Sequence, residues 1–157
     1  MSTLAFIPAT SPAQIEQARE LFLEYHSALD FSLCFEGFDK EVASLPGDYA
    51  PPDGRLFLAE YEGQLVGCVA LRKLEPGICE MKRLYLRPLV RGKGQGRVLT
   101  EFLIAEARQM GYTRLRLDTF EAKMPDAVAL YRKLGFREIP PYNNKSLPGT
   151  LFMELAL

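Results

Sequence analysis

Three glycines alternate with basic and polar residues in the stretch LVRGKGQGR, residues 89–97. The glycines are Gly92, Gly94 and Gly96, and the basic residues are Arg91, Lys93 and Arg97. Glycine lets another molecule approach the backbone closely. Backbone N–H groups that lie in a turn before a helix also attract anions. The stretch therefore predicts a binding site for a phosphate or pyrophosphate group.

This glycine stretch matches neither of two common phosphate-binding fingerprints. The P-loop pattern GxxxxGK[ST] is missing, and GxGxxG fails because its sixth position, counted from Gly92, is Arg97. The pattern that fits is Arg/Gln-x-x-Gly-x-Gly/Ala, written here as Arg91-Gly92-Lys93-Gly94-Gln95-Gly96. A strand-like run precedes it and a helical pattern follows it, which is the context that the pattern requires.

The strand-like run ICEMKRLYL, residues 78–86, changes its apolar phase. Cys79 and Met81 are apolar at odd positions, whereas Leu84 and Leu86 are apolar at even positions. A regular strand keeps its apolar side chains on one parity, and a slip of one residue is typical of a β-bulge. The alternative is a strand buried on both faces, whose basic residues extend toward water. A bulge would leave backbone N–H groups for a ligand.

The elements that must position these residues alternate between strands and helices. Strands are predicted at 4–9, 55–74 (a hairpin), 78–87, 112–120, from 136, and at 150–157; helices are predicted at 12–29, 38–45, 95–110 and 124–135. Ser11, Pro12 and Gln14 form a helix-start signature of the capping-box type. This order predicts an α+β or mixed α/β fold, in one domain that spans residues 1–157, with a mostly antiparallel sheet.

Composition excludes several classes of protein. The net charge is −1, from 19 basic and 20 acidic residues, so the chain lacks the overall basic character of a nucleic-acid-binding domain. Cys34, Cys68 and Cys79 show no metal-binding or redox spacing. No apolar run reaches the roughly 20 residues of a membrane helix. We expect a cytoplasmic protein without a metal, a membrane partner or a nucleic-acid partner.

Three segments together resemble the GCN5-related N-acetyltransferase (GNAT) superfamily. MKRLYLRPLVRGKGQGRVLTEFLIAEA resembles its acetyl-CoA-binding motif, DAVALYRKLGFRE its following helix and strand, and GRLFLAEYEGQLVGCVALR its central hairpin. The resemblance implies the acyl-CoA N-acyltransferase fold: a mostly antiparallel sheet of six to seven strands with a bulged fourth strand, flanked by about four helices. One departure is Met124, seven residues before Tyr131, where many members carry an asparagine that contacts the cofactor.

The resemblance also implies roles for individual residues. The pyrophosphate of acetyl-CoA should bind the backbone from Arg91 to Gly96 and the helix start at Arg97, and its pantetheine arm should pair with Leu84, Tyr85 and Leu86. Tyr131 matches the tyrosine that protonates the departing thiolate in many members. Glu80 lies eleven residues before Arg91, the spacing of the general base in the histone-acetyltransferase branch. The alternative is that Glu80 pairs with Lys82 or another cation across the sheet.

The acceptor amine is not identified by any motif. By resemblance, Tyr25 on the first helix and Tyr142 and Asn143 in the last loop are candidate acceptor contacts. The expected reaction is direct attack of a small-molecule or peptide amine on acetyl-CoA in a ternary complex, and the family also suggests a homodimer. The alternatives are a non-catalytic acyl-CoA sensor, or a transferase that uses another acyl-CoA. A nucleic-acid module is disfavoured by the balanced charge.

Overall fold

The computed structural model describes residues 3–29, 37–144 and 147–157. Its strands are β1 (Leu4–Pro8), β2 (Arg55–Tyr61), β3 (Gln64–Glu75), β4 (Ile78–Leu86), β5 (Arg114–Phe120), β6 (Arg137–Ile139) and β7 (Thr150–Ala156). Its helices are α1 (Pro12–Ala28), α2 (Phe38–Ala43), α3 (Gln95–Gln109) and α4 (Pro125–Lys133), with short 3-10 helices η2 (Gly47–Tyr49) and η3 (Pro88–Val90). None of the helices among these residues is both long and apolar enough to span a membrane.

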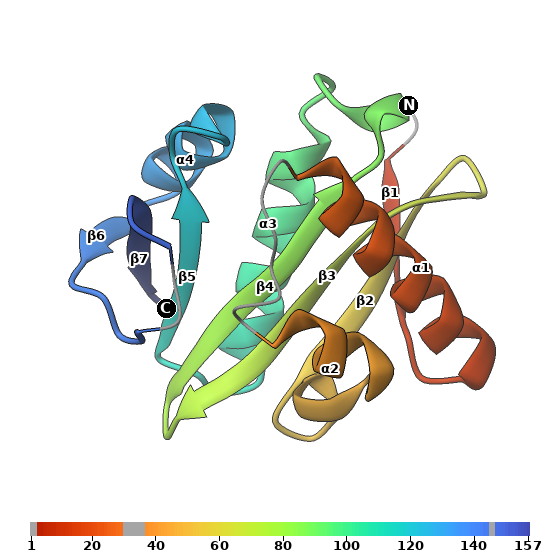
Figure 1. Cartoon of the computed structure of the whole chain (residues 1–157), viewed down its shortest axis with the longest axis horizontal. Helices are drawn as coiled ribbons and strands as arrows, with labels where there is room; N and C mark the ends of the chain where they lie inside the picture. Colours follow the sequence, from red (N-terminus) through yellow and green to blue (C-terminus); the bar gives the residue numbers. More distant parts are fainter. Residues whose placement is uncertain (1–2, 30–36, 145–146) are drawn as a thin grey trace.

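The seven described strands form one sheet in the order β1-β2-β3-β4-β5-β7-β6 (Figure 1). Neighbouring strands run antiparallel, except that β4 and β5 run parallel. The predicted mostly antiparallel sheet with flanking helices is therefore confirmed. The parallel pair lies at the centre of the sheet, where α3 makes the crossover between β4 and β5.

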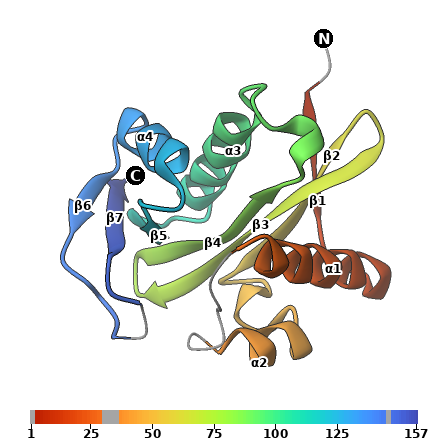
Figure 2. The same ribbon diagram turned by 45° about the horizontal axis from the view of Figure 1, so that its top comes forward.

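Helices cover both faces of the sheet. Figure 2 shows α1 and α2 on one side and α3 and α4 on the other. On the first side Phe22 of α1 and Phe38 of α2 are fully buried in one apolar cluster. On the second side Leu99 and Leu103 of α3 pack with Tyr131 of α4 in another. The sheet is thus buried on both faces at its centre.

Local signals explain where the helices begin and end. The capping box predicted for α1 is present: the Gln14 backbone N–H donates to the Ser11 hydroxyl at 3.2 Å, and the Gln14 side-chain oxygen accepts from the Ser11 backbone N–H at 3.0 Å. Helix α2 ends at Ala43 rather than at the predicted Leu45. Pro46 explains why Leu45 is not helical, because the helical conformation is disfavoured for a residue that precedes proline.

Candidate active site

Strand β4 carries the predicted bulge. Cys68 of β3 lies opposite Tyr85, but Ala70 lies opposite Lys82, so β4 has one more residue than β3 over this interval. Arg83 sits at the irregularity with a positive φ of 58°. The bulge is confirmed, and it turns Leu84 and Leu86 onto the same face as Cys79 and Met81, next to α3.

Two ion pairs hold the charged residues at the bulge. Arg83 binds Glu41 of α2 through two hydrogen bonds of 2.8 and 3.0 Å, and its guanidinium lies 5.1 Å from the centre of the Phe38 ring. The Lys82 ammonium lies 3.6 Å from a carboxylate oxygen of Asp118 on β5. Both basic residues are buried, so they do not extend to water as the alternative interpretation supposed.

Strands β4 and β5 separate just before the bulge. They pair only over Ile78–Glu80 and Arg114–Arg116, although β4 continues to Leu86. A cavity of about 600 Å³ lies beside the end of β4 that β5 does not pair with. Its wall runs from the glycine stretch, through the end of β4, to helix α4, and it includes Leu84, Tyr85, Leu86, Arg91, Gly92, Gly96 and Tyr131.

The glycine stretch opens onto one end of this cavity. Gly92 and Gly94 have positive φ angles of 76° and 74°, and Gly94 is the N-cap of α3. A Cβ atom built on Gly96 would meet no other atom within 4 Å. The start of α3 is therefore bare backbone facing an open space, as the predicted anion site requires.

The three basic side chains of the stretch are placed differently. Arg91 lines the cavity, donates a hydrogen bond of 2.8 Å to the Leu86 carbonyl, and lies 5.6 Å from the Tyr85 ring centre. Lys93 lies 5.9 Å from the Tyr61 ring, and Arg97 pairs with Glu101 at 3.3 Å. Of these three side chains, Arg91 is the one in position to contact a ligand in the cavity.

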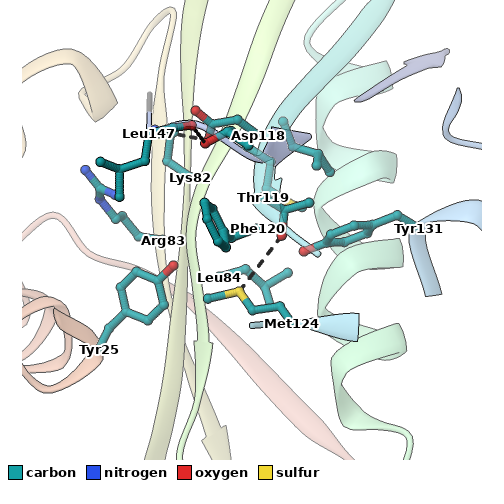
Figure 3. Close-up of a pocket in the computed structure, with 13 residues that line it drawn as sticks. Tyr25, Lys82, Arg83, Leu84, Asp118, Thr119, Phe120, Met124, Tyr131 and Leu147 are labelled. Carbon is teal, nitrogen blue, oxygen red and sulfur yellow. Dashed lines mark hydrogen bonds and ion pairs between the residues drawn. The ribbon is translucent and has the colours of Figure 1, made fainter. Parts of the chain in front are cut away.

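A second, smaller cavity of about 80 Å³ adjoins the first (Figure 3). Four residues line both cavities: Tyr25, Leu84, Met124 and Tyr131. The smaller cavity extends from them toward Lys82, Arg83 and Asp118. Two separate spaces thus meet at one point, next to the bulge and the Tyr131 phenol.

Tyr131 is suited to keep its proton. It is buried on α4, with its ring centre 5.5 Å from that of Phe136. Burial raises the pKa of its phenol well above the ordinary 10.0, and Tyr25 raises it further. The phenol therefore stays protonated at neutral pH and can donate that proton where the cavities meet.

Met124 occupies the position where many GNAT members have asparagine. It is the N-cap of α4, and its sulfur accepts a hydrogen bond from the Thr119 hydroxyl at 3.9 Å. The side chain faces both cavities but offers a thioether in place of an amide. Any polar contact with a ligand at this point must therefore come from neighbouring groups.

Glu80 lies buried in the sheet and lines neither of these two cavities. Its carboxylate accepts a hydrogen bond of 2.8 Å from Arg72, its register partner on β3, and one of 2.6 Å from the Tyr142 hydroxyl. Burial first, and then the Glu80 charge, raise the pKa of Tyr142. From the sequence, Glu80 was either a general base or the partner of a cation across the sheet. The contact with Arg72 is a pairing of the latter kind.

The predicted acceptor residues are not brought together. Tyr25 lines both cavities, whereas the Tyr142 hydroxyl is bound to Glu80 and Asn143 lines neither cavity. Sequence reasoning missed Asp118 and Arg72, which contact Lys82 and Glu80 from other strands. No local pattern could reveal these partners, because each contact depends on the pairing of strands. Cys68 and Cys79 are buried free thiols, and Cys34 lies outside the described residues.

Comparison with known proteins gives consistent matches. The model of the acetyltransferase (GNAT) family matches residues 15–136. An uncharacterized N-acetyltransferase of Schizosaccharomyces pombe is 34% identical over 158 residues, which cover 99% of this chain and 96% of that protein.

Solved structures show the same fold. A putative acyl-CoA N-acyltransferase from Klebsiella pneumoniae is 29% identical, with a TM-score of 0.70 over 100% of this chain and 98% of that one. A GNAT family acetyltransferase from Elizabethkingia anophelis, solved with acetyl-CoA bound, has a TM-score of 0.71 at 22% identity, over 99% of both chains.

Proposed function

The chain belongs to the acetyltransferase (GNAT) family and is an N-acetyltransferase that uses acetyl-CoA, and on this premise we propose that it transfers the acetyl group directly to an amine in a ternary complex. The observation that supports direct transfer is the meeting of two cavities at Tyr25, Leu84, Met124 and Tyr131. A donor in the larger space and an amine in the smaller space would react there without an intermediate carried by the protein.

The larger cavity suits coenzyme A as its ligand. We propose that the N–H groups from Arg91 to Gly96, the start of α3 and the Arg91 guanidinium bind the pyrophosphate. The open space at Gly96 supports this, because a phosphate can approach the backbone there. The bulged segment Leu84–Leu86 would pair with the amide groups of the pantetheine arm, because β5 does not pair with this part of β4.

The chemistry has two proton transfers for the protein to arrange. Acetyl-CoA supplies the acetyl group as a thioester; the amine nitrogen forms the new C–N bond while the C–S bond breaks. We propose that Tyr131 donates its proton to the departing sulfur, a role that its place between the two cavities supports. A backbone N–H at the bulge would stabilise the oxyanion.

The amine must also lose a proton, because a lysine-type amine has a pKa of about 10. We propose Glu80 as the base that receives it. A water molecule must then connect Glu80 to the amine, because neither Glu80 nor Tyr142, whose hydroxyl donates to Glu80, lines either cavity described above. If Glu80 instead acts only as the partner of Arg72, its replacement will affect stability more than the pH profile.

Release of coenzyme A tests this function. The protein should bind acetyl-CoA in a calorimeter and release coenzyme A in the presence of a suitable amine, with an acetylated product identified by mass spectrometry. Binding of acetyl-CoA without transfer to any amine in a broad panel would identify the chain as an acyl-CoA sensor. Faster turnover with another acyl-CoA would reassign the donor.

A further inference from the structure

The smaller cavity carries charge at the end away from Tyr131. Lys82, Arg83 and Asp118 line this end, and Figure 3 shows Lys82 and Asp118 opposite Met124. The Lys82 and Asp118 side chains are only 7% and 13% exposed. Charged groups are therefore concentrated in the wall of a small, partly enclosed space.

Stability alone does not explain a charged pair at this place. Taking two charges out of water costs several kcal/mol per ion, and apolar replacements of buried ion pairs are often equally stable or more stable. Here the pair does not fill the core, because it faces the cavity formed where β4 and β5 diverge. A charged wall of this kind is suited to recognise a charged ligand.

The signs of the charges indicate which ligand. Among the described residues the wall presents the Lys82–Asp118 pair, while Arg83 is bound to Glu41. Such a pair offers a cation to a carboxylate and a carboxylate to an ammonium, so it suits a ligand that carries both groups. The volume of about 80 Å³ is room for roughly five to eight water molecules, since each requires about 10–15 Å³. The acceptor group that enters is therefore small.

We propose that the acceptor is an amine that bears a carboxylate near its nitrogen, as an amino acid does, and that Lys82 binds this carboxylate. Asp118 holds the Lys82 ammonium in place, whereas Arg83 is bound to Glu41. The proposal rests on the proposed acetyl transfer and names its acceptor class.

Matched acceptors test the proposal with the wild-type protein. The twenty standard amino acids are compared with their carboxamides, which keep the amine and carry a neutral amide in place of the carboxylate. We expect kcat/KM for coenzyme A release to be at least about tenfold higher for the best amino acid than for its carboxamide, because a hydrogen bond to a charged group is lost. Equal or faster turnover of carboxamides, or of peptide amines, would overturn the proposal.

A charge-removing variant locates the effect. Lys82→Met should bring the ratio of amino acid to carboxamide close to one, mainly by lowering kcat/KM for the amino acid, while acetyl-CoA affinity stays within about threefold. The matched control is Lys73→Met, because Lys73 is exposed on β3 and lines neither cavity of the site. An unchanged ratio in a folded Lys82→Met protein would refute the assignment.

Three further outcomes separate the possible failures. If Lys82→Met does not fold, the double variant Lys82→Met/Asp118→Asn removes the unpaired carboxylate, and the wild-type comparison still decides the acceptor class. If acetyl-CoA binds but no amine is acetylated, the proposed transfer itself fails. If simple amines are acetylated without preference for a carboxylate, the transfer stands and the acceptor assignment falls.

Discussion

Gly96 gives the sharpest test of the pyrophosphate site, because a side chain there would enter the cavity without straining the fold. It lies in the first turn of α3, and an added Cβ meets no atom within 4 Å. Gly92 and Gly94 have positive φ angles, so substitution at either would also strain the backbone. For Gly96→Leu we therefore expect an unfolding free energy that is unchanged or higher by up to about 1 kcal/mol.

The same substitution should weaken acetyl-CoA binding strongly. The new side chain would displace the phosphate from the N–H groups at the helix start, and each hydrogen bond to a charged group contributes about 1.5–3 kcal/mol. Loss of one such bond raises Kd by about 10- to 100-fold, since 1.4 kcal/mol corresponds to a factor of ten. Calorimetric titration with acetyl-CoA measures this change, and a thermal melt without ligand verifies the fold.

Two controls make the result specific. Ala105→Leu places a leucine side chain on the exposed side of α3, outside the cavity, and should leave Kd unchanged. A short donor that lacks the pyrophosphate, such as an acetylated cysteamine thioester, should be used equally well by wild type and Gly96→Leu. A folded Gly96→Leu protein with wild-type affinity for acetyl-CoA would refute the pyrophosphate site.

Four further predictions concern catalysis and stability. Tyr131→Phe should lower kcat by about 100-fold or more while the Kd of acetyl-CoA changes little, and a wild-type kcat would remove the acid role. Glu80→Gln should depress kcat most at low pH if Glu80 is the base; a loss that is equal at every pH would leave it a structural partner of Arg72. Ser11→Ala should lower the free energy of unfolding in urea by about 1 kcal/mol, with kcat/KM unchanged, because it removes the cap of α1 far from the cavities. The pKa values of Tyr131 and Tyr142 are raised in the folded state, so above the ordinary pKa of 10.0 the unfolded chain releases phenolic protons that the folded chain keeps. The contribution of these two phenols to stability should therefore hold below pH 10 and fall above it by about 1.4 kcal/mol per pH unit for each phenol. Urea denaturation at pH 9 and pH 11 that gave equal stabilities would contradict the burial of these groups.

Features that depend on short stretches of sequence were predictable. The phase change between Met81 and Leu84 predicted the bulge, because alternation of side chains is set by the backbone alone. Ser11 and Gln14 predicted the start of α1 for a similar reason, since the capping contacts join residues three positions apart. The glycine stretch predicted the bare start of α3.

Contacts between distant segments were not predictable from patterns. Glu80 meets Arg72 because β3 and β4 pair in a particular register, and Tyr142 reaches Glu80 from a loop 62 residues further along the chain. The Lys82–Asp118 pair joins two strands that do not hydrogen-bond at that point. These contacts follow from the three-dimensional sheet order, which single-sequence periodicity does not encode.

Where β4 and β5 diverge, each strand has one side that is not paired with the other strand, so each resembles the edge strand of a sheet. Edge strands with unpaired backbone groups tend to recruit other strands and promote aggregation. A coenzyme arm bound along Leu84–Leu86 would act as a removable strand, so the protein without acetyl-CoA should aggregate more readily on heating. The gain in stability would follow ligand concentration, reaching about 2.7 kcal/mol at one hundred times Kd. Hydrogen exchange at the Leu84–Leu86 amides should then become slower as the concentration of acetyl-CoA rises, because the bound arm protects them.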